Sequence, residues 1–320
     1  MRLLLLATAV GLFVVGLLFG EPVSPDAAGP QRGVSPIVRR SLQEALATRH
    51  PAGSERIAGQ HGELREETFY SPTLGREMTY AIYLPPDYAT SGRRYPVLYA
   101  LHGVGGNYTE WVSFGVADAA DRLFTSGESP PYIIVFPQGD QSYWFNHPGG
   151  DRWADYLTDD VVPHIDQHYR TLAHREARAI GGLSMGATGA LQLGLRRPDL
   201  FGVVGAHSPS FRTTPEPADS YEPDEPEVFW YFRNPADYRP YDPFELAPQR
   251  AAAFRGTRLW LDVGDIDPWL ESVLRFHRLL EQLGIPHEFS IGSGTHEMTY
   301  WGPRMDQYVS YYGLALEPAA

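Results

Sequence analysis

The sequence predicts an α/β domain in which a mostly parallel, eight-stranded sheet is flanked by helices. From about Gly62 onward, short apolar runs bounded by turn residues alternate with helical patterns, which is typical of strands joined by crossover helices. Several runs, such as VLYALHG, YIIVFP and ARAIGGLS, are almost continuously apolar, as expected of parallel strands covered on both faces. The length of 320 residues leaves room for one domain of about 250 residues with appendages.

The expected elements follow from these patterns in chain order. We expect strands at residues 67–71, 78–84, 96–101, 132–136, 177–183, 202–207, 258–263 and 288–291. The first two form a hairpin around Pro72-Thr73-Leu74-Gly75. Helical patterns fall near residues 114–125, 154–168, 185–197, 269–283 and 299–313.

Residues 209–250 interrupt the pattern, because they show neither a strand nor a clean helical period. This insertion contains nine acidic residues, four Arg and nine aromatic residues. So aromatic a composition favours a lid or a pocket wall over a disordered loop.

The N-terminus has the composition of a targeting segment. Arg2 precedes an apolar run from Leu3 to Phe19, and Gly20-Glu21-Pro22 follows it. This order is typical of a secretory signal, although about 18 apolar residues can also span a bilayer. We therefore expect residues 1–20 to be a signal peptide or a membrane anchor, and the protein to be exported: secreted, periplasmic or anchored facing outside. Residues 21–58 are expected to form a linker with one short helix before a domain at 59–316.

Composition excludes several kinds of chemistry. The chain has no cysteine and all 26 basic residues are Arg, which rules out a disulfide scaffold, a thiol nucleophile, Cys-ligated metals and a catalytic lysine. The net charge of −13 disfavours nucleic acid and anionic membranes as partners. We expect no cofactor and no metal, and membrane contact only through residues 1–20 if they are not cleaved.

The run Gly182-Leu183-Ser184-Met185-Gly186 matches the pattern G-x-S-x-G. The string alone is a weak signal, but it follows the apolar run 177–183 and opens the helical pattern MGATGALQLGL. A serine at such a sharp strand-to-helix turn exposes its hydroxyl and is typical of a catalytic nucleophile. The alternative is a glycine-rich turn with an incidental serine. We predict that Ser184 is a nucleophile.

A nucleophilic serine needs a base, and the base needs a group that orients it. In this architecture they follow in the order Ser, Asp or Glu, His, and His296 lies in a Gly/Ser/Thr loop after the last expected strand. Asp262 falls inside a strand run, where its side chain is expected in a packed face or the preceding loop. Asp267 lies beyond that strand and is the favoured acid, with Asp265 as the alternative.

Two further features bear on the chemistry. The glycine-rich stretch 101–107 ends the third expected strand, and such a loop leaves backbone N–H groups free to face a developing oxyanion. The expected donors are the N–H groups of Val104 and of Met185, the residue after the nucleophile; the alternative is an ordinary tight turn. His164 and His168 lie four residues apart on one helix face, and we favour an exposed pair over a metal site.

The sequence blocks resemble one family of α/β hydrolases. REETFYSPTLGREMTYAIYLPPDY, YPVLYALHGVGGNYTEW, GGLSMGATGAL, LDVGDID and GTHEMTYW follow one another as in the putative-esterase family, which contains esterase D-like enzymes, feruloyl and acetyl-xylan esterases, enterochelin esterases and the antigen 85 mycolyltransferases. The resemblance extends from about Gly62 to Tyr312. It implies an α/β-hydrolase fold, with Ser184 as nucleophile, Asp267 as acid, His296 as base and Val104 with Met185 as oxyanion donors.

The expected function is therefore that of a serine esterase acting on a small-molecule or carbohydrate-linked ester through an acyl-enzyme. An acyltransferase of the antigen 85 type is the alternative within the same chemistry. A catalytically inactive binding protein with this fold, using the aromatic insertion as its surface, is the alternative from another class. Residues 209–250 match no subgroup motif, so the substrate is the least transferable expectation.

Overall fold

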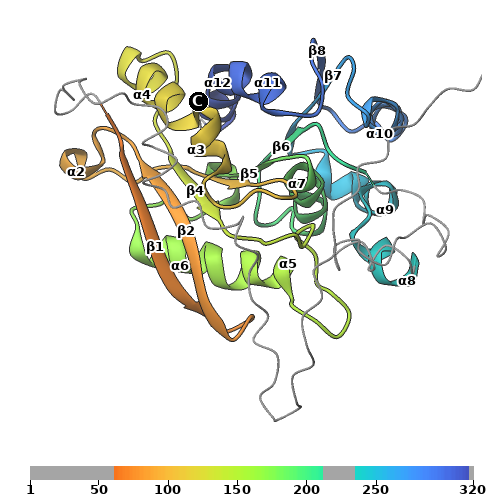
Figure 1. Ribbon diagram of the computed structural model, residues 1–320, viewed down its shortest axis with the longest axis horizontal. Helices are drawn as coiled ribbons and strands as arrows, with labels where there is room; N and C mark the ends of the chain where they lie inside the picture. Colours follow the sequence, from red (N-terminus) through yellow and green to blue (C-terminus); the bar gives the residue numbers. More distant parts are fainter. Residues whose placement is uncertain (1–60, 212–234, 317–320) are drawn as a thin grey trace, which may run out of the picture. The chain divides into compact units, whose positions relative to one another are not determined.

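The computed structural model describes residues 61–211 and 235–316. Within them the chain forms one eight-stranded sheet with the order β1-β2-β4-β3-β5-β6-β7-β8 (Figure 1). β1 and β2 form an antiparallel hairpin, and β2 pairs antiparallel with β4. All remaining pairs are parallel. The predicted α/β fold with a mostly parallel, eight-stranded sheet is confirmed.

Each expected strand coincides with an observed one to within a few residues at its ends. The strands are β1 (Glu63–Ser71), β2 (Arg76–Leu84), β3 (Val97–Leu101), β4 (Ile133–Pro137), β5 (Arg178–Leu183), β6 (Val203–His207), β7 (Arg258–Gly264) and β8 (Glu288–Gly292). The expected hairpin turn at residues 72–75 lies between β1 and β2, where Gly75 adopts a φ of 66°.

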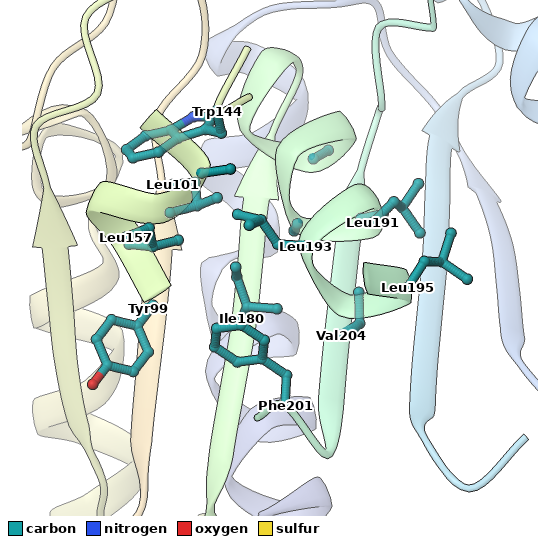
Figure 2. Close-up of a cluster of buried hydrophobic side chains, with 14 of the residues drawn as sticks. Tyr99, Leu101, Trp144, Leu157, Ile180, Leu191, Leu193, Leu195, Phe201 and Val204 are labelled. Atoms are coloured by element: carbon teal, nitrogen blue, oxygen red, sulfur yellow. The ribbon is translucent and has the colours of Figure 1, made fainter. Parts of the chain in front are cut away.

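Helices cover both faces of the sheet, because the side chains of each strand alternate between two apolar layers. In β3, Val97, Tyr99 and Leu101 join the layer that contains residues of α5, α7, α9 and α10, part of which Figure 2 shows. Leu98 and Ala100 join the layer that contains residues of α3, α4 and α12. Continuous burial of both faces explains why the parallel strands read as unbroken apolar runs.

On the first face lie α5 (Trp153–Asp155), which continues through a π-helical turn (Tyr156–Val161) into α6 (Val162–His168), together with α7 (Met185–Arg196), α9 (Pro243–Phe254) and α10 (Leu270–Gln282). On the second lie α3 (Glu110–Phe114), α4 (Val116–Ser126), α11 (Met298–Trp301) and α12 (Met305–Ala315). Two further short helices are α2 (Tyr88–Ser91) and α8 (Pro235–Tyr238).

The expectation that residues 209–250 lack a helix is wrong for their last part, which forms α8 and most of α9. Asp242 caps α9, because its carboxylate accepts a hydrogen bond from the Phe244 N–H at 2.9 Å, and Pro243 occupies the first helical position, where no N–H is needed. Pro248 lies inside the helix and obscured its periodicity. Residues 212–234 of the insertion lie outside the described residues.

The predicted export segment and linker, residues 1–58, also lie outside the described residues, so both remain predictions. In the two described stretches, no helix combines the length and the apolar character that a bilayer crossing requires.

Candidate active site

Ser184 occupies the turn between β5 and α7 in a strained conformation, with φ 54° and ψ −115°. A positive φ is rare for a residue with a side chain and persists only where the surroundings enforce it. Here the flanking glycines allow the close packing: a Cβ on Gly182 would collide with the backbone of Gly186, and one on Gly186 with the carbonyl oxygens at the end of β3. The predicted strand–turn–helix setting of the motif is therefore present.

The structure brings Ser184, His296 and Asp267 together. His296 Nε2 lies 2.7 Å from Ser184 Oγ, and His296 Nδ1 lies 2.9 Å from Asp267 Oδ2. The three residues follow β5, β8 and β7 respectively. Because the carboxyl ends of parallel strands meet at one edge of the sheet, residues more than 100 positions apart become neighbours there.

The Asp267 carboxylate is held from both sides. Its Oδ1 accepts a hydrogen bond from the Trp269 N–H at 2.8 Å, while Oδ2 faces His296. The carboxylate is fully buried, whereas the His296 side chain is 19% exposed. The Trp301 ring packs edge-on against the imidazole with centroids 5.0 Å apart. These contacts fix the ring plane while its Nε2 edge faces the serine.

The other two aspartates of the predicted set have different partners. Asp265 Oδ1 accepts from the Gly294 N–H at 2.9 Å, so this side chain links the turn after β7 to the loop that carries His296. Asp262 is buried and lies beside His207, with a carboxylate-to-Nδ1 distance of 2.5 Å. It therefore lies in a packed layer, as its position in the strand run suggested.

The glycine-rich loop after β3 lies against the serine. A Cβ on Gly103 would come 3.3 Å from the Ser184 Cβ, and Gly105 adopts a φ of 77°. Val104, one expected oxyanion donor, lies in this loop with an exposed side chain. Met185, the other, is the first residue of α7, a position whose N–H has no acceptor within the helix. The two expected donors thus lie in segments adjacent to Ser184.

Two side chains that the sequence did not single out support this loop, the buried His102 and the half-buried Glu110. His102 donates from Nδ1 to the Gly103 carbonyl oxygen at 2.9 Å and accepts at Nε2 from the Gly139 N–H at 3.0 Å. Burial lowers the pKa of His102 to about 4, so the ring is neutral, as these bonds require. Its place at the end of an apolar strand run was the available signal.

Glu110 lies beneath the same loop and accepts from the Gly103 N–H at 2.7 Å. A Cβ on Gly106 would collide with the Glu110 carboxylate, so a side chain at that position would require the carboxylate to move. Burial raises the pKa of Glu110 to about 7. Nothing in the local sequence marks this glutamate, since its role depends on the path of the loop above it.

A small aromatic pocket begins one helical turn from Ser184. Thr188 N–H donates to the Ser184 carbonyl oxygen at 3.1 Å, and the pocket is lined by Thr188 together with Tyr143, Phe145, Phe211, Tyr238, Tyr241, Asp242 and Pro243. Its free space is about 20 Å³, about enough for one water molecule. Burial raises the pKa of Asp242 to about 6. Aromatic residues of the 209–250 insertion therefore contribute a pocket wall close to the serine.

Of the histidine pair on α6, His168 is exposed, as expected, whereas His164 is half-buried. The rings of His164 and His168 lie 4.2 Å apart, His164 Nε2 lies 3.1 Å from the Tyr80 hydroxyl, and His168 Nδ1 donates to the His164 carbonyl oxygen. His164 also stacks on Phe69. Among the described residues, no three His, Asp or Glu side chains are grouped so that they could hold a metal ion.

The mostly parallel sheet, with a strained serine at the turn after β5, defines the class of the protein: it is an α/β hydrolase. Residues 71–312 match the family model described as "Putative esterase". Since the match covers more than half of the chain, the protein belongs to this esterase family.

Two curated relatives illustrate the similarity. An endo-1,4-beta-xylanase/feruloyl esterase of Xylanibacter ruminicola is 36% identical over 154 residues, which are 45% of this chain and 21% of the relative. Esterase Rv1288 of Mycobacterium tuberculosis is 34% identical over 145 residues, which are 44% of this chain and 31% of the relative. The matched regions thus span a fifth to a third of these longer proteins.

Solved structures agree on the fold. A ferulic acid esterase superposes with a TM-score of 0.72 at 27% identity, covering 80% of this chain and 98% of that protein. The fluorophosphonate-binding serine hydrolase F of Staphylococcus aureus superposes with a TM-score of 0.67 at 20% identity, covering 81% of this chain and all of that protein. The second likeness extends to the fold alone.

Proposed function

We propose that this protein is a serine esterase that hydrolyses carboxylic esters, with Ser184 as nucleophile, His296 as general base and Asp267 as the orienting acid. The observation that carries the proposal is the continuous hydrogen-bonded line from Asp267 Oδ2 through both nitrogens of His296 to Ser184 Oγ. A nucleophile, a base and an orienting group in this order activate a serine hydroxyl on several unrelated folds.

The geometry supports two-step acyl transfer. His296 Nε2 removes the Ser184 proton as Oγ attacks the ester carbonyl, while Asp267 holds the proton on Nδ1 and stabilises the imidazolium. The N–H groups of Val104 and Met185 receive the oxyanion, each at a gain of about 3 kcal/mol in the transition state. His296 then protonates the leaving alcohol and, in the second step, activates the water that releases the acid.

The substrate class is proposed from the pocket and the relatives together. The similarity to a feruloyl esterase and to a ferulic acid esterase structure favours aromatic acyl groups such as ferulate, and the aromatic pocket beside Thr188 offers rings against which such a group could stack. Because the pocket itself has room for about one water molecule, a ferulate ring would lie across its mouth and not inside it.

Export remains part of the proposal. The charge and apolar pattern of residues 1–20 support a signal peptide or an anchor, so the ester substrate would be met outside the cytoplasm. Export is equally compatible with an acyltransferase of the antigen 85 type. No observation in the described residues favours transfer over hydrolysis.

The test is hydrolysis of p-nitrophenyl esters from acetate to decanoate, and of methyl ferulate, by the wild type and by Ser184→Ala. We expect activity in the wild type and a loss of at least about 10⁴-fold in the variant. The acyl group that is hydrolysed fastest then indicates the size of the space that receives the acyl group. An active Ser184→Ala protein would overturn the proposal. A slow wild type that becomes fast when trehalose or glycerol is added would identify a transferase.

A further inference from the structure

A second aspartate–histidine pair lies buried behind the candidate active site. His207 ends β6 and Asp262 lies directly opposite in β7, and His207 Nδ1 donates to Asp262 Oδ2 at 2.5 Å. His207 Nε2 meets the Tyr312 hydroxyl at 2.9 Å. Burial raises the pKa of Tyr312 well above its usual value, so this hydroxyl stays neutral.

Two more tyrosines complete the cluster around the same carboxylate. The hydroxyls of Tyr300 and Tyr308 both donate to Asp262 Oδ1, at 2.9 and 3.2 Å. Asp262, His207 and the two tyrosines are all buried. Burial raises the pKa of both phenols, so each remains a hydrogen-bond donor, and Asp262 accepts from three side chains on three different elements.

Each of the three proposed catalytic residues is bonded to a member of the cluster or lies within five residues of one. The His207 carbonyl oxygen accepts from the Ser184 N–H at 3.1 Å. Asp262 lies five residues before Asp267 on the same strand and turn, and Tyr300 lies four residues after His296, in α11 (Figure 1). The Asp262 carboxylate thus connects β7, which precedes Asp267, with α11, which follows His296.

Tyr300 also packs directly against the loop that carries His296. A Cβ on Gly294 would come 3.0 Å from the Tyr300 ring, and one on Gly264, at the end of β7, 3.4 Å. The Arg304 guanidinium lies over the same ring, 3.8 Å from its centroid, and donates to the carbonyl oxygens of Tyr300 and Ser293. The ring therefore lies between the strand end and the loop, and its hydroxyl is bonded to the strand.

We propose that Asp262 and Tyr300 form a buried brace that fixes the loop carrying His296 relative to β7, so that Tyr300 is a positioning residue for the esterase reaction. This inference rests on the proposed function. Tyr300 does not face the substrate. It fixes the position and orientation of the His296 imidazole in which Nε2 lies within hydrogen-bond distance of Ser184 Oγ. Small misplacements of a reacting group cost large factors in rate, so a brace at this point acts on kcat.

The structure offers a matched pair of substitutions to test the brace. Tyr300→Phe and Tyr308→Phe each remove one hydroxyl bonded to the same carboxylate oxygen, and each keeps the ring and its packing. Tyr308 stacks on His207, with ring centroids 3.8 Å apart, and comes from α12, whereas Tyr300 lies in α11, which begins two residues after His296. The two variants are therefore expected to lose similar amounts of thermal stability.

We expect kcat to fall about 10- to 100-fold in Tyr300→Phe with KM unchanged, and to stay within about twofold of the wild type in Tyr308→Phe. Each kcat is calculated per active site titrated by a fluorophosphonate, so unfolded protein does not contribute. Equal kcat values in the two variants, at equal melting temperatures, would overturn the brace. Ser184→Ala is assayed beside the two tyrosine variants. If Ser184→Ala is active, the esterase proposal itself is overturned. If Ser184→Ala is inactive and the two tyrosine variants have equal kcat values, only the brace is overturned.

Discussion

The molecule contains two aspartate–histidine pairs with the same connectivity and different surroundings. In both, a carboxylate Oδ2 on or just after β7 faces a histidine Nδ1, at 2.9 Å for Asp267–His296 and 2.5 Å for Asp262–His207. The His296 side chain is 19% exposed, whereas the His207 side chain is completely buried. The pairs differ above all in what the other ring nitrogen meets: Ser184 Oγ in one, the Tyr312 hydroxyl in the other.

This difference shows that an Asp–His pair does not define a reactive site. Tyr312 is a buried phenol to which no substrate has access. The Asp262–His207 pair, called the inner pair below, can therefore only hold neighbouring elements in place. Ser184 lies on a strained turn next to a glycine-rich loop, where a carbonyl group can approach. In the proposed function the same interaction therefore serves catalysis for Asp267–His296, whereas for Asp262–His207 it joins two neighbouring strands.

The largest expected effect comes from changing the aspartate of the Asp267–His296 pair, called the outer pair below. In Asp267→Asn the amide would present an N–H to His296 Nδ1 and favour the tautomer that cannot accept the serine proton. We expect kcat/KM to fall about 10⁴-fold, with the fold intact. Steady-state hydrolysis of p-nitrophenyl acetate and far-UV circular dichroism measure the two properties.

Asp265→Asn is the matched control, because Asp265 lies two residues away in the same turn and bonds the loop backbone through Oδ1, which an asparagine retains. Activity within about tenfold of the wild type is expected. If Asp265→Asn were the inactive variant and Asp267→Asn the active one, the outer pair would be assigned to the wrong aspartate.

The sequence predicted the outer pair and the sheet for a definite reason. Strand runs, the strained serine turn and a histidine loop after the last strand are local patterns, and the fold brings the ends of parallel strands to one edge. The relative order of the three residues along the chain then indicated which aspartate and which histidine would meet. None of this required knowledge of the side-chain packing.

The inner pair could not be predicted in the same way. His207 and Asp262 meet through the register of β6 and β7, which no local pattern encodes, and Tyr300 reaches them from a helix 38 positions further along. The one available signal was a polar residue in each otherwise apolar run, His207 at the end of β6 and Asp262 inside β7. α9 was missed because Pro248 interrupts its pattern, although Asp242-Pro243 is a typical helix start.

The next largest effect is expected when the histidine of the inner pair is replaced by alanine. The same replacement in the outer pair is expected to abolish activity. His207→Ala leaves the buried Asp262 carboxylate without its imidazole partner, and such losses cost about 3–5 kcal/mol in the free energy of unfolding. Urea denaturation measures this. His296→Ala, in contrast, is expected to abolish activity while changing the free energy of unfolding by less than about 1 kcal/mol, since removing its partly exposed ring lets water reach the Asp267 carboxylate.

Combining His207→Ala with Asp262→Asn sharpens the comparison, because the asparagine removes the charge that the histidine satisfied. The double variant is expected to be more stable than His207→Ala alone. If His207→Ala were as stable as the wild type, the inner pair would contribute no more than ordinary packing.

The smallest expected effect concerns Glu110, a half-buried carboxyl that lies against the glycine-rich loop after β3 and is bonded to the Gly103 N–H. Burial raises its pKa to about 7, above the ordinary value near 4.5. Below pH 4.5 the group is protonated in both the folded and the unfolded chain. Between pH 4.5 and 7 only the unfolded chain ionises, so the folded state loses stability as the pH rises, by about 1–3 kcal/mol once the pH exceeds 7.

Glu110→Gln removes this titration and keeps an acceptor for Gly103. We therefore expect the variant and the wild type to be about equally stable at pH 4.5, and the variant to become the more stable of the two at pH 8, as measured by urea denaturation at each pH. A stability difference that stayed constant from pH 4.5 to 8 would show that Glu110 ionises in the folded protein as readily as in water.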